Sequence, residues 1–105
     1  MPPQRYPYIP QTKGEMMDYL AMVMLSSPTF KDDYFPYRNV ETVFYSLNEG
    51  LKAIRKKVGE ERYAELVSLS DRMRAHFEAD PEDKTEDTIK GRELVHRMED
   101  IITKR

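Results

Sequence analysis

The chain has 105 residues, of which 39% are hydrophobic and 34% charged, and its formal net charge is −2. This length predicts one domain, residues 1–105, and the charge gives no general attraction for nucleic acid. The absence of cysteine excludes disulfides, thiolate nucleophiles and zinc–thiolate sites, and the densest apolar stretch, 19–25, is far shorter than the roughly 20 residues that span a bilayer.

Residues 1–11 contain four prolines, which prevent a helix and favour an extended N-terminal arm. The arm lacks the basic-then-apolar pattern of a signal peptide, so we expect a cytoplasmic protein. The first helix is expected to begin near Thr12, because Thr12 and Glu15 have the spacing of a capping box. An apolar stripe continues to Met24, and Pro28 ends the helix because the residue before a proline avoids the α conformation.

The next segment, residues 29–38, reads TFKDDYFPYR and has no helical period. Its aromatic rings have two open interpretations. They close the end of the helical core, or they form an exposed binding surface, since aromatic residues are enriched at interface hot spots. We expect a mixture in which Tyr34 and both acids face outward. The aromatic and acidic residues of this aromatic loop are Phe30, Asp32, Asp33, Tyr34, Phe35 and Tyr37.

The second helix is expected to run from an N-cap at Asn39 to Val58, with Gly59 in the C′ position. Gly50 inside it either marks a close helix–helix approach or is a glycine that the helix merely tolerates. Apolar residues at spacings of three and four predict one buried face. These residues are Val40, Val43, Phe44, Leu47, Leu51, Ile54 and Val58.

The third helix is expected from Glu60 to Asp80, directly after Gly59, which makes the second and third helices antiparallel neighbours. An acidic linker, residues 80–87, leads to a fourth helix that is expected to begin near Thr85 or Thr88 and to end at Ile102. We therefore predict an all-α, four-helix bundle-like domain with a long antiparallel hairpin of helices two and three. The inward residues expected on the last two helices are Tyr63, Leu66, Val67, Ser70, Met73, Phe77, Ile89, Leu94, Val95, Met98, Ile101 and Ile102.

Catalytic and metal motifs are weak in this sequence. Glu93 and His96 match the Glu-x-x-His pair of di-iron bundles, but a second pair is missing, because Met73 stands three residues before His76. A metal-binding bundle is therefore only a minor alternative. We expect no metal, no cofactor and no enzymatic activity.

The acidic linker is the second candidate binding surface, after the aromatic loop. Its five acids and single lysine, Lys84, give this stretch a charge of −4, which is more negative than the whole chain. Such a surface is suited to a basic protein partner. The residues predicted to bind the partner are Asp32, Asp33, Tyr34, Tyr37, Asp80, Glu82, Asp83, Glu86 and Asp87.

A basic run, residues 52–57, carries four cations near the end of the second helix. The simplest interpretation is a solvated helix end whose positive charge complements the helix dipole. The alternative is a surface for an acidic partner. DNA binding through a helix-turn-helix is disfavoured, because Glu60 and Glu61 would begin the recognition helix and repel phosphates.

The central stretch NVETVFYSLNEGLKAIRKKVGEERYAEL, with its LNEGL and GEERY segments, resembles small helical bacterial immunity proteins of toxin–immunity pairs. The resemblance covers at most residues 34–79 and implies a cytoplasmic protein that neutralises a toxin by binding it, with a basic toxin domain as partner. An alternative is a self-associating structural protein, a homodimer that buries methionine-rich faces against a second copy. Neither reading includes nucleic acid or membrane as a partner.

Overall fold

The computed structural model describes residues 8–31 and 38–104, and within these ranges the protein consists of helices and their connections, with no strand. The predicted all-α class is therefore confirmed. No helix in these ranges is long and apolar enough to cross a membrane. The helices are α1 (Lys13–Ser26), α2 (Val40–Ala53), α3 (Arg55–Val58), α4 (Glu60–Ala79) and α5 (Glu86–Thr103).

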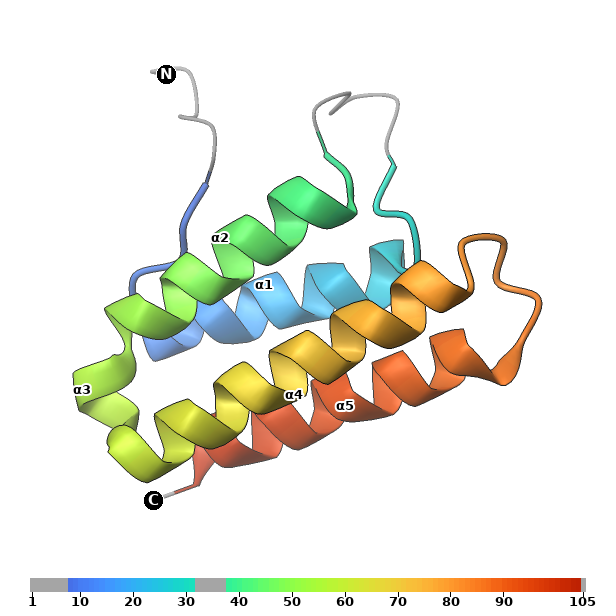
Figure 1. The fold of residues 1–105 in the computed structure, drawn as a ribbon. Coiled ribbons are helices and arrows are strands. Elements are labelled where there is room, and N and C mark those ends of the chain that lie inside the picture. The colour runs from blue at the N-terminus through green and yellow to red at the C-terminus, as the bar shows by residue number, and fades with distance from the viewer. Residues whose placement is uncertain (1–7, 32–37, 105) are drawn as a thin grey trace, which may run out of the picture.

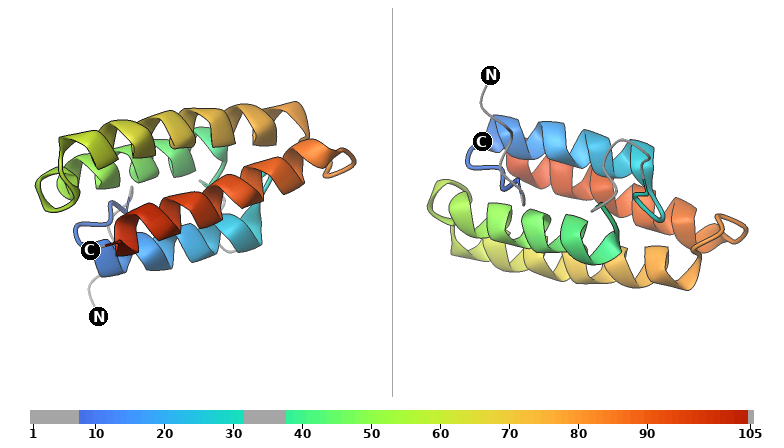
Figure 2. Two further views of the ribbon diagram at one scale, coloured as in Figure 1. Left: turned by 90° about the horizontal axis from the view of Figure 1, so that it is seen from below. Right: turned by 90° about the horizontal axis from the view of Figure 1, so that it is seen from above.

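The four long helices form two layers, with α1 beside α5 in one and α2 beside α4 in the other (Figures 1 and 2). Each long helix packs against two others: α1 and α4 both contact α2 and α5. The contact between α4 and α5 is the most extensive, and that between α1 and α2 is the least. Apolar side chains from all four helices fill the space between the layers.

Polar residues at the predicted positions begin the helices. The Thr12 hydroxyl accepts a hydrogen bond from the Glu15 amide at 3.0 Å, as expected, whereas the Glu15 carboxylate accepts from the amide of Gln11. Asn39 caps α2 through a reciprocal box with Thr42. These side chains satisfy amide groups that have no partner inside the helix, which fixes where α1 and α2 start.

The predicted second helix is interrupted, which corrects the sequence-based expectation of one helix to Val58. Ile54 has φ −98° and ψ 5°, and it separates α2 from the short α3. Both Ile54 and Val58 remain buried, and the Ile54 carbonyl accepts from the amides of Lys57 and Val58. The break therefore preserves core packing and backbone bonding while it redirects the chain. Gly59 follows with φ 91°, a left-handed conformation that favours glycine.

The buried faces of α4 and α5 differ from the prediction at two large apolar residues. Ile89 was expected to face inward but is 55% exposed, whereas Leu69, which was not selected, is buried. Each residue of an α-helix turns the side chain by about 100°. Because Thr88 is buried beside Asp80, its neighbour Ile89 points away from the core.

Phe30 supports the interpretation that part of the aromatic loop closes the core. Its ring is fully buried and packs edge-on against Phe44 and Phe77, at centroid distances of 6.0 and 5.6 Å. The other aromatic and acidic residues of that loop lie outside the described residues, so this result applies to Phe30 alone. They are Asp32, Asp33, Tyr34, Phe35 and Tyr37.

The end of the N-terminal arm packs against α1 and α2. Tyr8 lies against Tyr19 with a centroid distance of 5.9 Å, and Pro10 is buried. A Cβ atom on Gly50 would lie 2.6 Å from Cε of Met16 and 2.7 Å from Cγ of Pro10. Gly50 therefore marks a close approach to α2 by the N-terminal arm and by the Met16 side chain of α1.

Candidate binding surface

The candidate surface lies at the end of the molecule where α4 turns into α5, opposite α3 (Figure 1). The turn, residues 80–85, joins two helices that pack closely together. The segment that follows α1 and the first turn of α2 meet it at the same end. Two of the predicted regions, the acidic linker and the flanks of the aromatic loop, are thus brought together by the fold.

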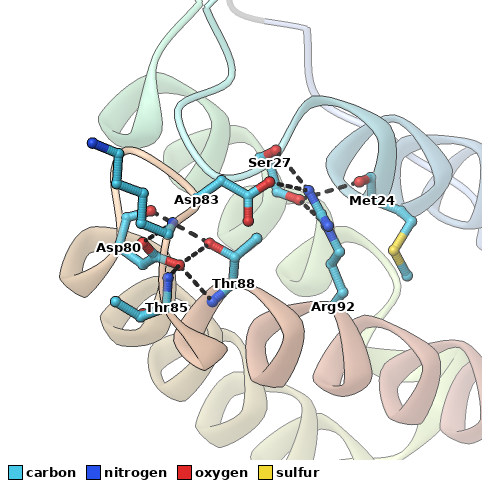
Figure 3. Close-up of polar contacts among 8 residues, drawn as sticks. Met24, Ser27, Asp80, Asp83, Thr85, Thr88 and Arg92 are labelled. Carbon is cyan, nitrogen blue, oxygen red and sulfur yellow. Dashed lines mark hydrogen bonds and ion pairs between the residues drawn. The ribbon is translucent and has the colours of Figure 1, made fainter.

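Asp80 is the organising residue of this turn rather than a surface acid, and this corrects its predicted role. It is only 2% exposed, although it belongs to a strongly acidic stretch. One carboxylate oxygen, Oδ1, accepts from the Lys84 amide at 2.8 Å. The other, Oδ2, accepts from the Thr85 amide at 3.0 Å and from the Thr88 hydroxyl at 2.8 Å (Figure 3).

These contacts set the ionisation of Asp80. Burial by itself raises the pKa of a carboxyl group, because it removes water from the charged form. The hydrogen bonds from the Lys84 amide, the Thr88 hydroxyl and Thr85 outweigh that effect and hold the pKa of Asp80 far below its ordinary value. Asp80 is therefore a carboxylate at neutral pH, and its charge is used inside the turn.

The remaining acids of the turn face solvent. Glu82, Asp83 and Glu86 are exposed, and Asp87 is partly exposed. Glu82 pairs with Lys84 at 2.9 Å across the surface, an exposed pair that contributes at most about 1 kcal/mol. Oδ1 of Asp87 lies 2.8 Å from Nδ1 of His76 on α4, and both side chains are partly exposed.

Arg92 connects this turn to the end of α1. Its Nε donates to the Ser27 hydroxyl at 2.9 Å, and its Nη2 donates to the Ser27 carbonyl oxygen at 3.1 Å. The same Nη2 lies 3.7 Å from the carboxylate of Asp83 (Figure 3). Arg92 thus ties the chain after α1, helix α5 and the acidic turn into one unit.

A groove of about 370 Å³ opens beside the acidic turn. Proline and other apolar side chains form much of it, Glu41 and Glu78 contribute negative charge, and Lys31 contributes one positive charge. The groove residues are Pro28, Thr29, Lys31, Asn39, Val40, Glu41, Phe77, Glu78 and Pro81. An apolar recess bordered by carboxylates can receive an apolar side chain that has a cationic neighbour.

Sequence reasoning located part of this surface. It selected Glu82, Asp83, Glu86 and Asp87, whereas Asp32, Asp33, Tyr34 and Tyr37 lie outside the described residues and stay predictions. It missed the groove and the roles of Thr88 and Arg92. The one signal for Thr88 was its position at a helix start after an aspartate, and no local signal marks Arg92. The surface residues that the sequence missed are Lys31, Glu41, Glu78 and Arg92.

The residues of the minor metal alternative are arranged differently from a metal site. Glu93 and His96 are both exposed, and Nδ1 of His96 lies 3.1 Å from the carboxylate of Glu99 instead. In the part of the chain that the structure describes, no group of three or more histidine, aspartate or glutamate side chains could hold a metal ion.

No protein-family model matches the chain, and no curated protein and no solved structure matches it either.

Proposed function

We propose that the chain is a non-enzymatic protein-binding module that recognises a basic protein through the acidic turn and the adjoining groove. Its scaffold in this proposal is a four-helix bundle-like domain in which α2 and α4 act as an antiparallel hairpin. The observation that carries the proposal is that the buried Asp80 carboxylate accepts hydrogen bonds from within the turn. One buried carboxylate holds the backbone of the turn, and the neighbouring acids Glu82, Asp83 and Glu86 are left exposed on it.

A turn held in this way suits recognition, because binding costs less when the contacting groups are already ordered. The Asp83 amide donates to the Asp80 carbonyl oxygen at 3.2 Å, and Asp83 adopts φ 55°. Its carboxylate is restrained further by Arg92. The exposed acids thus start from a fixed arrangement, which favours a partner with matching cations over one with diffuse positive charge.

The groove supplies the apolar part of the proposed contact. Affinity in protein complexes comes mainly from a few buried apolar or aromatic anchors, and surface charges chiefly increase the association rate and the specificity. An anchor side chain of the partner would occupy the recess beside Val40 and Pro81. Lysine or arginine residues next to that anchor would face Glu82, Asp83 and Glu86.

A basic toxin domain is the partner class that the resemblance to bacterial immunity proteins suggests. The chain would then act in the cytoplasm, cover the toxin's active surface and require neither cofactor nor nucleic acid. The aromatic-loop residues Asp32, Asp33, Tyr34 and Tyr37 belong to the same proposed surface on sequence grounds, because their segment is flanked by groove residues Lys31 and Asn39.

Affinity capture from the native organism tests the proposal with a matched pair of triple variants. The E82Q/D83N/E86Q variant removes three charges from the acidic turn. The E65Q/D71N/E93Q variant removes three from exposed positions elsewhere on α4 and α5. We expect wild type and the second variant to capture the same basic protein, and the first to lose it. Co-expression of the chain should relieve the toxicity of that protein, whereas equal capture by both variants contradicts the proposed surface.

Self-association is the second candidate, because two large aliphatic side chains lie on the surface. Leu25 near the end of α1 is 85% exposed, and Ile89 near the start of α5 is also exposed. A homodimer would bury them against a second copy. Light scattering at high micromolar concentration decides between the two candidates: a dimer that L25S/I89S converts to a monomer supports self-association, and a wild-type monomer removes it.

A further inference from the structure

The end of the molecule that carries α3 lies opposite the acidic turn (Figure 1). Its sequence is rich in cations, in contrast to that turn. Ile54 and Val58 are both buried, and the three residues between them are directed outward. These are Arg55, Lys56 and Lys57, and all three are exposed. The break after α2 therefore presents consecutive cations on one short turn.

Acidic neighbours hold two cations of this end in place. Nζ of Lys52 lies 2.7 Å from the Glu49 carboxylate. Arg55 makes a bidentate pair with Glu60, in which Nε and Nη2 donate at 2.8 and 2.7 Å. The Arg55 guanidinium also lies 4.6 Å from the centre of the Tyr63 ring. A planar guanidinium held by a carboxylate and an aromatic ring loses little freedom when another molecule contacts it.

Lys56 and Lys57 are different, because neither forms an ion pair with any residue in the described ranges. Cations in a last helical turn are favoured by the helix dipole, typically by about 0.3–1 kcal/mol. That effect accounts for positive charge at this position. It does not explain why Lys56 and Lys57 have no counter-ion when the neighbouring Lys52 and Arg55 each pair with a glutamate.

Tyr63 lies next to these cations, and Tyr45 lies on the adjoining part of α2. Tyr45 is 53% exposed, and Tyr63 is partly buried under Arg55. Tyr45 lies seven residues before Lys52 on α2, which places it on the same face of the helix about two turns away. Tyrosine and arginine are enriched at the energetic centres of protein interfaces, so this mixture resembles an interface more than a solvated helix end.

We propose that the surface formed by Tyr45, Lys52, Arg55, Lys56 and Lys57 binds an acidic segment of a second protein. The proposal is independent of the proposed function, because the acidic turn and groove lie at the other end of the molecule. The chain could therefore hold two partners at once. Nucleic acid fits less well, because Glu49, Glu60 and Glu61 interrupt the positive charge and would repel a continuous phosphate backbone.

Fluorescence anisotropy with a labelled peptide rich in glutamate, aspartate and phenylalanine tests this surface on the intact chain. We expect K56E/K57E to weaken peptide binding by about tenfold or more, since like charges then face the peptide. The matched control, R72E/K90E, makes the same change of charge at exposed positions of α4 and α5 away from α3 and should change binding less than about twofold. Y45S should weaken binding by about threefold without a change of charge.

Three results overturn the proposal. The first is that the wild-type chain fails to bind the peptide. The second is that K56E/K57E and R72E/K90E weaken binding equally, which indicates a general charge effect. The third is that a single-stranded oligonucleotide of equal charge binds more tightly than the peptide and is lost in K56E/K57E, which assigns the surface to nucleic acid. Circular dichroism of every variant confirms that all remain helical, since the substituted side chains are exposed.

Discussion

Thr88 and Asp80 form a buried side-chain pair, in which the Thr88 hydroxyl donates to Asp80 Oδ2 at 2.8 Å across the turn between α4 and α5. The pair converts one acid of an acidic stretch into an internal brace. The other acids of that stretch are consequently displayed on a fixed backbone. Stability of the turn and availability of the surface acids therefore depend on the same carboxylate.

Thr88→Val should destabilise the protein by about 1–3 kcal/mol, because a valine of nearly the same shape leaves the Asp80 oxygen without its hydroxyl donor in a buried site. Thr103→Val is the control, since its exposed hydroxyl bonds only to carbonyl oxygens of its own helix. Urea unfolding monitored by circular dichroism measures both. Equal effects of the two substitutions would show that the Thr88 hydroxyl does not brace the turn.

Acid should weaken the protein through Asp80. Its pKa is lowered in the folded state, so its contribution is complete above the unfolded-state pKa of about 3.9 and is lost as pH falls below that value toward the folded pKa. Asp80→Asn cannot titrate and should be less stable than wild type at pH 7. The difference in unfolding free energy should then shrink as the pH is lowered below about 4. A difference that stays constant with pH contradicts the assigned ionisation.

Gly91→Ala should destabilise the protein by about 1–3 kcal/mol, the usual range for overpacking in a core. A Cβ atom at this position of α5 would lie 2.8 Å from Cδ1 of the buried Phe77 ring, so the ring or the helix must move. Gly14→Ala is the matched control, because its Cβ would meet only the Thr12 hydroxyl at 3.9 Å. That substitution should stabilise the protein by about 0.5 kcal/mol by restricting the unfolded chain. Thermal and urea unfolding measure the change in stability that each substitution causes.

Phe30→Ala should cost about 3–5 kcal/mol, as truncation of a buried phenylalanine usually does. The ring contacts Phe44 and Phe77, so its loss opens a cavity between α2 and α4. Tyr45→Ala removes an exposed ring from α2 and should stay within about 0.5 kcal/mol of wild type. If the two substitutions destabilise the protein equally in urea unfolding, Phe30 does not close the core.

The sequence predicted the helices well where local signals decide the outcome. Thr12 and Asn39 cap their helices, Gly59 takes a left-handed conformation, and the apolar spacing of α2 corresponds to buried residues. It failed at Ile54, because the apolar period continues through the break. The interruption depends on how the chain turns toward α4, which is a tertiary constraint.

The candidate surface was predictable only in part. An acidic stretch is visible in the sequence, but the identity of the buried acid is not, because Asp80 is selected by the positions of the Lys84 amide and the Thr88 hydroxyl in space. The groove brings together residues that are distant in sequence, such as Pro28 and Pro81. The contact of Arg92 with Ser27 is of the same kind.

The most direct test of the central claim is an NMR titration of the isotope-labelled chain with the protein that it captures. If the acidic turn and groove form the binding surface, the amide signals of Lys31, Val40 and residues 78–88 will shift or broaden most. Signals of α3 will then change little. Perturbations that fall on α3 or on the outer faces of α1 and α5, with residues 78–88 unchanged, would contradict the account.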